Sequence, residues 1–193
     1  MAGFFKEFLS NHHDTGALAP SSRFLARKIV SEAGVAPGSQ VLELGPGTGA
    51  FTGAVSDALG EEGKVGYLGV EINPRFHEQL TAKFPGLRFE LASASEFDFG
   101  SAGENGSEMV FDSVVSGLPW AGFETELQTA ILDNVIPQIK EGGTFTTFAY
   151  TGLHLRAPGR SFRKLLNERF SKVRRTRTIF LNLPPAFVYV AQK

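Results

Sequence analysis

Cysteine is absent from the sequence, and so is any long apolar run. Without cysteine the chain can form neither a disulfide framework nor a thiolate nucleophile nor a zinc–cysteine cluster, and we expect no bound metal. No stretch approaches the ~18 apolar residues that a membrane-spanning helix needs, and the N-terminus lacks the basic-then-apolar pattern of a secretory signal. We therefore expect a cytoplasmic protein with no transmembrane helix.

The composition that remains is typical of one globular domain. Of 193 residues, 42% are apolar and 20% are charged, which is enough for one full core but not for two of ordinary size. The net charge of −1 is unevenly spread, because residues 151–193 contain ten basic residues and one acidic residue. They therefore carry +9, and residues 1–150 carry −10. A basic C-terminal face favours an anionic partner such as phosphate, nucleic acid or a membrane surface; the alternative is a solvated face without a partner.

Strand-like apolar runs alternate with helical stretches along the chain. The expected strands are 40–44, 65–70, 88–91, 109–118, 143–150, 173–180 and 186–191. The expected helices are 2–11, one that begins at Ser21 or Ser22, 50–59, one capped by Asn73, 124–139 and one after Pro158. This alternation predicts an α/β fold: a single Rossmann-like domain with a seven-stranded, mostly parallel sheet, helices on both faces and a C-terminal antiparallel hairpin. We expect two units, N-terminal helices at 1–35 and the core domain at 36–193.

The stretch VLELGPGTGAF runs from an expected strand into a glycine-rich loop at 45–50. The loop satisfies the dinucleotide pattern G-x-G-x-x-G/A, and Glu71 supplies an acid after the next strand, so the pattern alone is consistent with a nicotinamide cofactor. Glu43, two residues before the first glycine, would repel a pyrophosphate and suits a ligand that carries an ammonium group. The chain also has no room for a separate substrate domain, and a terminal hairpin is unusual in a dinucleotide fold.

The pattern E-x-G-x-G-x-G, with an acid ending the next strand, resembles the class I S-adenosylmethionine-dependent methyltransferases. The resemblance implies S-adenosyl-L-methionine as cofactor and S-adenosylhomocysteine as product. Glu43 would lie near the cofactor's ammonium or sulfonium end, Glu71 would accept both ribose hydroxyls, and Ile72 would flank the adenine. The segment 93–95 stands where such enzymes often have an Asp–Ala pair. The residues implied in cofactor binding are Glu43, Gly45, Pro46, Gly47, Thr48, Gly49, Glu71, Ile72, Asn73, Ser93, Ala94, Ser95 and Ser116.

A second motif, SGLPW at 116–120, follows the fourth expected strand. It resembles the N-x-P-[FYW] and D/N-P-P-[FYW] motifs of methyltransferases that modify exocyclic amines, with Ser in place of Asn or Asp. The resemblance implies that Ser116 and the carbonyls up to Leu118 accept hydrogens from the amine, and that the face of Trp120 attracts a cationic head group. Alternatively, Leu-Pro-Trp only closes a strand and packs the next helix. Both a nucleic-acid adenine and an aliphatic amine on a small head group fit this motif.

The N-terminal stretch MAGFFKEFLS predicts an amphipathic helix. Phe4, Phe5 and Phe8 share one face and Lys6 lies opposite. Such a helix suffices for reversible attachment to a membrane, with anionic lipids favoured, but not for an integral anchor. The alternative is that the aromatic stripe folds back as a lid over the cofactor site.

Over nearly its full length the sequence resembles the bacterial phospholipid N-methyltransferases of the PmtA type. The matching stretches are FFKEFL, TGALAPSSRFLA, VLELGPGTG, SGLPW, GGTFTTFAY, GR-x-F and NLPPAFVY. The family methylates phosphatidylethanolamine stepwise to phosphatidylcholine, which implies an enzyme at the inner face of the membrane; we expect a monomer and no nucleic-acid partner. Asn182 lies in the expected turn NLPP and would border the substrate entrance. The alternative hypothesis is an RNA adenine N6-methyltransferase, because ribosomal RNA adenine dimethylases share the glycine loop and an N-L-P motif with this sequence.

Transfer to an amine also needs a proton acceptor and a site for the lipid phosphate. The candidates for the proton acceptor are Tyr150, which ends the strand TTFAY, and the carbonyls of Ser116 to Leu118, followed by His154. Arg160 or Arg163 could hold the phosphate, because arginine offers bidentate contacts. A solvated helix face is the alternative for both arginines.

Overall fold

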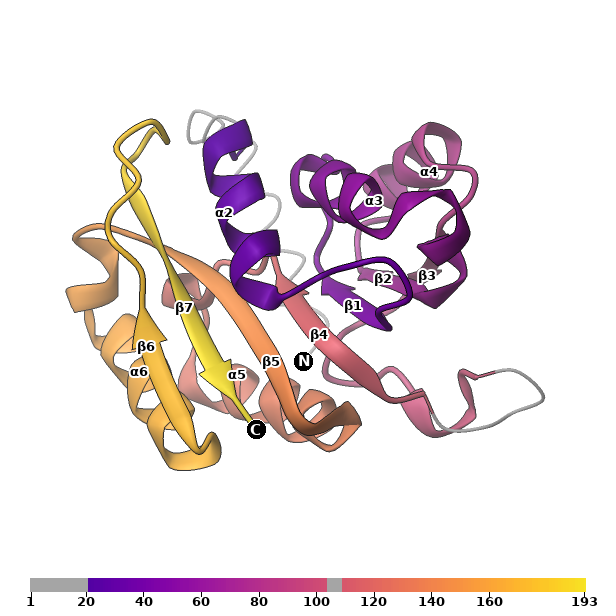
Figure 1. Ribbon diagram of the computed structural model, residues 1–193. Helices are drawn as coiled ribbons and strands as arrows, with labels where there is room; N and C mark the ends of the chain where they lie inside the picture. The colour runs from indigo at the N-terminus through magenta and orange to yellow at the C-terminus, as the bar shows by residue number, and fades with distance from the viewer. Residues whose placement is uncertain (1–20, 104–108) are drawn as a thin grey trace.

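The computed structural model describes residues 21–103 and 109–193, which form one mixed sheet with helices on both faces (Figure 1). In the described part of the chain the sheet has seven strands in the order β3-β2-β1-β4-β5-β7-β6. The strands are β1 (Val41–Leu44), β2 (Tyr67–Glu71), β3 (Arg88–Leu91), β4 (Phe111–Ser116), β5 (Ile139–Tyr150), β6 (Lys172–Arg175) and β7 (Ala186–Gln192). β1 to β5 are parallel, whereas β7 pairs antiparallel with both β5 and β6. The predicted fold class, with its C-terminal hairpin, is confirmed.

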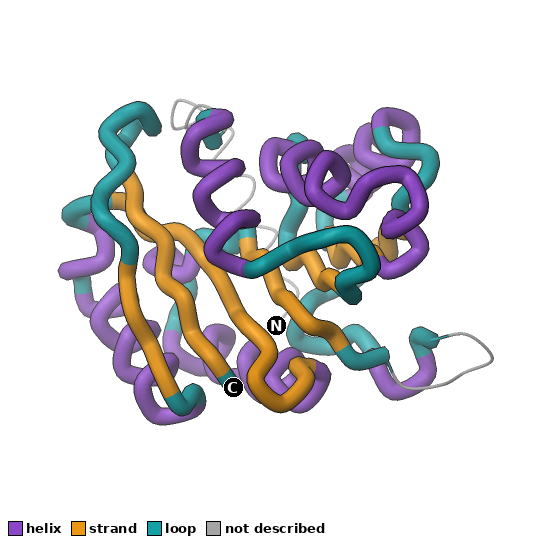
Figure 2. The backbone as a smooth tube through the Cα atoms, viewed as in Figure 1, coloured by secondary structure: helices purple, strands orange, loops and turns teal. Residues whose placement is uncertain are grey.

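Two layers of helices cover the sheet, as the tube in Figure 2 also shows. α2 (Arg23–Ala33), α3 (Ala50–Gly63) and α4 (Pro74–Lys83) lie on one face, and α5 (Thr125–Val135) and α6 (Ala157–Arg169) lie on the other. Successive residues of a strand face opposite sides, so Val41 joins the core under α2 and α3, while Leu42 joins the core under α5 and α6. The central strand β1 is buried on both faces, which explains why its sequence is almost continuously apolar.

The helix starts follow the predicted capping signals. The Ser22 hydroxyl accepts a hydrogen bond from the Leu25 N–H, and the Asn73 side chain accepts from two N–H groups in the first turn of α4. α2 packs on the sheet through Leu25 and Ile29, both fully buried. The rest of the predicted N-terminal unit at 1–35, including the helix at 2–11, lies outside the described residues.

Several predicted boundaries are wrong, among them three in the second half of the chain. The helix expected at 124–139 ends at Val135, because Pro137 has no N–H to donate; a short 3₁₀ turn, Ile136–Gln138, leads directly into β5. β5 consequently begins at Ile139, before the predicted 143–150. β6 ends at Arg175 rather than at residue 180, and beyond it only the bridge between Ile179 and Ala186 continues the pairing.

The carboxyl ends of the parallel strands meet at one edge, here called the carboxyl edge. The β6–β7 connection, residues 176–185, lies at this edge, because Tyr150 at the end of β5 pairs with Ala186 at the start of β7. In open α/β sheets ligands bind at such an edge, where the strand order reverses; here that point lies between β1 and β4. Within the described ranges no helix is both long and apolar enough to cross a bilayer.

Candidate active site

The glycine loop after β1 interlocks with the loop after β4. Gly45, Gly47 and Gly49 all have positive φ angles, of 63°, 57° and 81°. A Cβ on Gly45 would lie 2.6 Å from Cδ2 of Leu118, and a Cβ on Gly117 would lie 2.6 Å from the Gly45 carbonyl oxygen. Gly117 therefore lets the two backbones touch, and Gly45 combines a positive φ with space for the Leu118 side chain.

Glu71 closes the other side of this crevice. Its carboxylate is buried and accepts hydrogen bonds from the N–H groups of Gly47 (2.9 Å) and Asn73 (2.8 Å). Burial raises the pKa of Glu71, although these backbone hydrogen bonds act to lower it. The sequence thus places this acid correctly at the glycine loop; its contact with ribose hydroxyls stays a prediction.

Glu43 lies behind the glycine loop and not in the crevice. Its side chain is fully buried on the α2–α3 face, where it accepts hydrogen bonds from the hydroxyls of Tyr67 (2.7 Å) and Thr52 (3.1 Å). Burial raises the pKa of this carboxyl to about 7, partly offset by the two hydroxyl donors. Strand alternation explains the placement, since Glu43 follows Leu42 and so shares the face of Val41. The described contacts make Glu43 a support for the first turn of α3; its predicted approach to the cofactor's ammonium end stays a prediction.

A small pocket opens next to Gly45 and Glu71. It has a volume of about 30 Å³ and draws on the ends of β1, β2, β3 and β4 as well as on α5. Its lining includes the predicted residues Gly45, Glu71, Ile72, Ser93 and Ala94, together with Val70, Ala92, Leu118, Leu127 and Ile131. We call it the nucleoside pocket, because an apolar lining with a carboxylate at its rim has the chemistry that a purine and its ribose require. It holds about one or two water molecules as it stands, so its side chains must move apart to admit a base.

The remaining predicted cofactor residues support this pocket rather than line it. Asn73 caps α4 and donates its N–H to Glu71, and the Ser95 hydroxyl pairs with that of Ser93 (2.8 Å). Pro46 is buried, whereas Thr48 is exposed at the tip of the loop and accepts from Lys83 through its carbonyl. The α5 residues Leu127 and Ile131 were missed by the sequence analysis, because an apolar residue on an amphipathic helix carries no signal that distinguishes a pocket from the core.

The Ser116 hydroxyl, predicted to accept an amine, is already engaged within the chain, so its role as amine acceptor stays a prediction. Its hydroxyl oxygen is fully buried and accepts hydrogen bonds from Nε1 of Trp120 (3.0 Å) and the Leu118 N–H (3.3 Å). Its carbonyl accepts from the Thr147 hydroxyl, and the Leu118 carbonyl accepts from the Trp120 N–H. Of the carbonyls predicted to receive an amine, that of Gly117 alone has no donor within the described residues.

Trp120 is mainly a core residue, which favours the alternative prediction that it packs against a helix over attraction of a cationic head group to its face. Only 3% of its surface is exposed, and its ring stacks on Phe162 with centroids 4.3 Å apart. One face of the indole is therefore covered by another ring and is closed to a cation. The rest of the ring contributes to a cavity described next.

A larger cavity, here called the acceptor cavity, begins one residue after the nucleoside pocket. Leu118 lines the nucleoside pocket and Pro119 lines the acceptor cavity. The cavity has a volume of about 190 Å³ and a predominantly apolar, aromatic wall. Its lining residues are Pro119, Trp120, Ala121, Gly122, Phe148, Ala149, Tyr150, Leu153, His154, Arg156, Gly159, Phe162 and Tyr189.

The polar groups of the acceptor cavity come from the end of β5 and the turn before α6. Tyr150 is half-buried at the cavity wall, and burial raises the pKa of its phenol. The phenol therefore keeps its proton at neutral pH, so it can accept a hydrogen bond from an amine but is a poor proton acceptor. His154 lies beside it, with Nδ1 3.4 Å from the Tyr150 carbonyl oxygen and its ring edge-on to Phe187. Imidazole is the commonest general base in enzymes, which makes His154 the better candidate.

The arginine at this cavity is not one of the two that were predicted. Arg156 lines the acceptor cavity, whereas Arg160 and Arg163 lie on the exposed side of α6 and do not. The Arg160 guanidinium donates to the carbonyl of Leu155, so it stabilises the turn before the helix. Arg156 was missed because it precedes the GR-x-F motif that drew attention to Arg160.

Asn182 ties the β6–β7 connection to the start of α2, and its predicted place at the substrate entrance stays a prediction. Its side-chain oxygen accepts from the Ser22 N–H (2.9 Å), and its side-chain nitrogen donates to the Pro184 carbonyl (2.7 Å). The residue is buried. The other predicted membrane residues, Phe4, Phe5, Lys6 and Phe8, lie outside the described residues.

Comparisons with known sequences give two distant relatives, and no protein-family model matches the chain. An ornithine lipid N-methyltransferase from Singulisphaera acidiphila is 29% identical over 143 residues, which cover 74% of this chain and 73% of that protein. A ribosomal RNA small subunit methyltransferase A from Prosthecochloris aestuarii is 28% identical over 94 residues, covering 49% of this chain but only 34% of the relative.

Solved structures of methyltransferases share the fold. The N-methyltransferase NodS from Bradyrhizobium japonicum has a TM-score of 0.66 at 14% identity, with 89% of this chain and 95% of that chain covered. A second structure of that enzyme, in complex with S-adenosyl-L-homocysteine, has a TM-score of 0.65 and covers 89% of this chain and 86% of that chain. The chain therefore has the fold of the class I S-adenosylmethionine-dependent methyltransferases, and these comparisons bear out the predicted cofactor, S-adenosyl-L-methionine. Among its relatives the lipid N-methyltransferase matches over the greater length.

Proposed function

We propose that the protein methylates the amine of a membrane lipid, with phosphatidylethanolamine and its mono- and dimethyl derivatives as acceptors, to give phosphatidylcholine. The observation that carries this proposal is the acceptor cavity, an aromatic and apolar chamber that begins one residue after the nucleoside pocket and has Arg156 at its wall. A small head group fits such a chamber, and a cation near it suits a lipid phosphate. The similarity to an ornithine lipid N-methyltransferase supports an acceptor of this class.

The acceptor amine arrives protonated, and the cavity favours its neutral form. If the ammonium has a pKa near that of lysine, about 10.4, removing its proton at pH 7 costs about 4–5 kcal/mol. Moving an ammonium into an apolar chamber lowers its pKa, because burial disfavours the charged form. His154 lies at the wall to take the proton. The enclosing rings, among them Phe148 and Phe162, limit the access of water.

The chain's other contribution is positioning. Bound S-adenosyl-L-methionine supplies an electrophilic methyl group on a sulfonium. Glu71 and the glycine loop hold the nucleoside side of the crevice, and the Gly117 carbonyl and the Tyr150 hydroxyl orient the amine through its N–H groups. Holding both reactants at the Leu118–Pro119 boundary makes transfer effectively intramolecular, with no covalent enzyme intermediate.

A second candidate function is methylation of an RNA adenine, suggested by the ribosomal RNA methyltransferase relative. Base methylation of that type uses a free polar acceptor and an accessible aromatic face at the SGLPW position. Here the Ser116 hydroxyl is engaged by Trp120 and Leu118, and Phe162 covers the indole. We therefore favour the lipid amine, and we propose a monomer at the cytoplasmic face of the membrane with no nucleic-acid partner.

The proposal is tested by giving the enzyme radiolabelled methyl donor and four acceptors in parallel. These are phosphatidylethanolamine, an amino-acid lipid with a free amine, phosphatidylcholine as a control without a methylatable amine, and an RNA transcript. Label in mono-, di- and trimethylated phosphatidylethanolamine supports the proposal. Label in the amino-acid lipid alone moves the acceptor to that lipid class, and label in RNA alone overturns the assignment.

A further inference from the structure

The β6–β7 connection carries three large apolar side chains that the fold does not bury. Phe180 is 80% exposed, Leu181 66% and Leu183 78%. They flank the buried Asn182, which fixes the tip of this connection in place through hydrogen bonds to Ser22 and Pro184. Such exposure costs free energy in water, and single exposed residues are ordinary, but three in four consecutive positions form an apolar patch.

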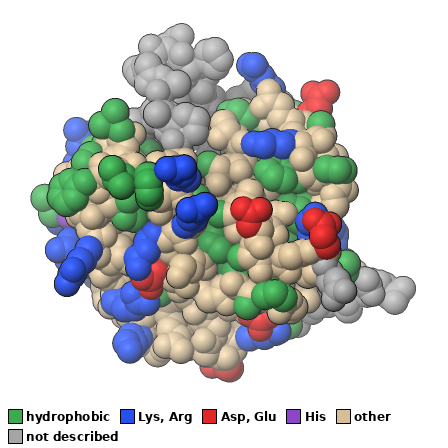
Figure 3. Space-filling view, turned by 45° about the horizontal axis from the view of Figure 1, so that its top comes forward, with side chains coloured by type: hydrophobic (Ala, Val, Ile, Leu, Met, Phe, Trp, Pro, Cys, Tyr) green, Lys and Arg blue, Asp and Glu red, His purple; other side chains and the backbone are tan. Residues whose placement is uncertain are grey.

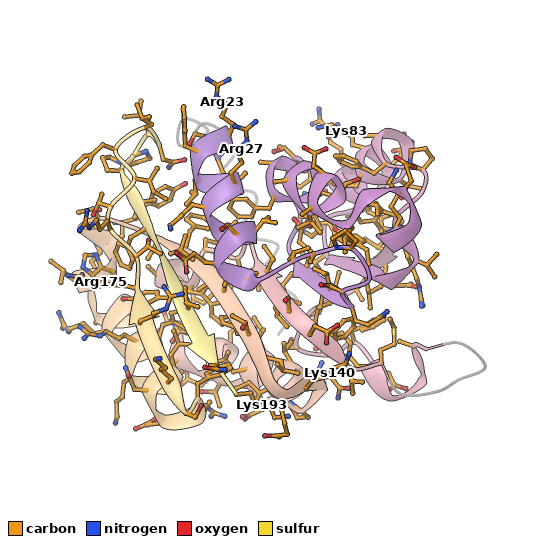
Figure 4. All side chains as sticks on the ribbon, in the orientation of Figure 1. Arg23, Arg27, Lys83, Lys140, Arg175 and Lys193 are labelled. Carbon is orange, nitrogen blue, oxygen red and sulfur yellow. The ribbon has the colours of Figure 1, made fainter. Side chains whose placement is uncertain are left out.

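Unpaired cations border this patch. The bond between Asn182 and Ser22 brings the tip next to the start of α2, where Arg23, Phe24 and Arg27 are exposed. Arg177 is exposed on the connection itself. None of the three arginines has an ion-pair partner within the described residues. Figure 4 shows Arg23 and Arg27 at the carboxyl edge, with Lys140 and Lys193 at the opposite edge.

Among the described residues, two acidic side chains lie near these arginines or elsewhere on α2. Asp57 on α3 faces Arg23 and Arg27 across an open groove between the two helices. Glu32, at the far end of α2, is already paired with Lys28 and Arg174. In the space-filling view, hydrophobic and basic side chains gather together at the end of the molecule formed by the β6–β7 connection (Figure 3).

The patch lies near the wall of the acceptor cavity, because Thr151 follows Tyr150, which lines the cavity. The Thr151 N–H donates to the carbonyl of Pro185, so the end of β5 is tied to the β6–β7 connection. The turn that follows exposes Leu155 directly before Arg156, which lines the cavity. Exposed apolar side chains with cations beside them thus lie close to the wall of the acceptor cavity.

We propose that this surface seats on an anionic phospholipid bilayer, with the β6–β7 tip inserted at the depth of the head groups. The docking surface comprises Arg23, Phe24, Arg27, Leu155, Arg177, Phe180, Leu181 and Leu183. Apolar side chains beside unpaired cations match a bilayer, whose hydrocarbon boundary accepts the former and whose anionic head groups attract the latter. This orientation turns the acceptor cavity towards the membrane, so a lipid can present its head group without leaving the bilayer. The use of the cavity for a lipid rests on the proposed function.

Vesicle binding tests the docking surface without any methylation. The full chain is sedimented with vesicles of phosphatidylcholine alone and with phosphatidylcholine containing phosphatidylglycerol, neither of which offers a methylatable amine. Binding to the anionic vesicles is expected to exceed binding to the neutral ones and to weaken with added salt. The triple variant Phe180→Ser, Leu181→Ser and Leu183→Ser should lose at least ~100-fold in partition coefficient, since each buried side chain contributes about fivefold to tenfold.

Matched variants separate a docking surface from a general loss of apolar or basic surface. Val65→Ser removes a residue that is 85% exposed and lies before β2, at the opposite edge of the sheet, and should leave binding unchanged. Arg23→Gln and Arg27→Gln should each weaken binding to anionic vesicles by about fivefold, whereas Lys172→Gln, at the far end of β6, should not. Equal binding of wild type and triple variant would overturn the proposal.

Insertion of the tip has its own spectroscopic readout. Trp120 is the single tryptophan and is buried, so Leu181→Trp adds a reporter that alone meets the bilayer. Its emission should shift to the blue and be quenched by brominated lipid tails in anionic vesicles. An unshifted emission spectrum would refute insertion of the tip. If neither protein binds vesicles and the wild type forms a dimer that the triple variant loses, the surface binds another copy of the chain and the proposal is refuted. Methylation of a detergent-dispersed acceptor by the triple variant shows separately whether the proposed activity holds.

Discussion

The two halves of the sheet build their sites by different means. In the nucleoside half, β1 to β3 with α3 and α4, the pocket is shaped by backbone: glycines at positive φ, N–H groups and one buried carboxylate hold the crevice. In the acceptor half, β4 to β7 with α5 and α6, the cavity is shaped by side chains, chiefly aromatic rings with a histidine and an arginine at the wall. The first half therefore has little tolerance for added atoms, while the second can change shape through its side chains.

Charge divides along the same line. Residues 111–193, which contain β4 to β7 with α5 and α6, carry a net charge of +5, and residues 1–110 carry −6. A negative half suits a cofactor with a sulfonium and an ammonium, and a positive half suits the phosphate of a lipid. Three substitutions, each with a matched control, test this difference between the halves.

The largest effect is expected for Gly45→Ala in the glycine loop. The new methyl would lie 2.6 Å from the Leu118 side chain, and residue 45 has a φ of 63°. Left-handed strain of about 1–2 kcal/mol and overpacking of about 1–3 kcal/mol should lower the stability together. Cofactor affinity, measured by calorimetry, should fall at least ~100-fold, because Leu118 is forced into the nucleoside pocket.

Gly34→Ala provides the matched control for that substitution. Gly34 has a similar φ of 72° but nothing within 4 Å of its added Cβ. The Gly34→Ala variant should lose stability through backbone strain alone and should bind the cofactor with wild-type affinity. Equal cofactor affinity in the two variants would mean that the interlocked loops do not shape the pocket.

The next effect concerns the buried Glu43 and is a dependence of stability on pH. Burial raises its pKa from the ordinary 4.5 to about 7 in the folded protein. Between these values the folded state keeps a proton that the unfolded chain has lost, so the free energy of unfolding falls as the pH rises from about 4.5 to about 7 and then levels off. Glu43→Gln should reduce this loss, which amounts to about 2–3 kcal/mol, in urea unfolding measured at pH 5 and pH 8.

Glu32 supplies a comparison of opposite sign. Hydrogen bonds from Lys28 and Arg174 lower its pKa, so its contribution to stability is present above pH 4.5 and is lost as the pH falls through the folded value. Glu32→Gln should therefore destabilise slightly at pH 8 and leave the loss between pH 5 and pH 8 intact. If Glu43→Gln shows the same profile as Glu32→Gln, the carboxyl of Glu43 is not held neutral by burial.

The smallest effect is expected in the acceptor half, for Tyr150→Phe. The substitution removes a hydroxyl from the cavity wall but no ring, so turnover should drop about tenfold while cofactor affinity stays the same. Tyr189→Phe removes a hydroxyl from the same cavity and should change turnover by no more than about twofold. Unchanged turnover in both variants would leave the amine to be oriented by the Gly117 carbonyl alone.

Local sequence signals predicted the nucleoside half well, because its chemistry depends on backbone. Glycines at fixed spacing and the acid after β2 indicate a loop and its partner, and Gly47 and Glu71 do form a hydrogen bond. The place of Glu43 could not be derived, since a four-residue strand gives no indication of which face its polar residue takes. Tyr67 and Thr52, which bind it, come from separate elements.

The acceptor half resisted prediction because long-range packing decides it. The motif SGLPW predicts that Trp120 has an accessible aromatic face. In the structure that face is covered by Phe162 on α6, which lies 42 residues further along the chain. Asn182 resembles a substrate-binding residue in NLPP, yet its partner is the Ser22 N–H, 160 residues away. Arg156 had no motif at all and is placed at the cavity by the turn between β5 and α6.

The position of Leu118 between the two cavities affects any attempt to redesign the enzyme. It presses on Gly45, lines the nucleoside pocket and precedes the first residue of the acceptor cavity. A smaller residue there, chosen to admit an enlarged synthetic methyl donor, would loosen Pro119 and thereby alter which amines are accepted. Changes in donor specificity and in acceptor specificity are therefore coupled in this fold, and mutant libraries should vary residues 118 and 119 together.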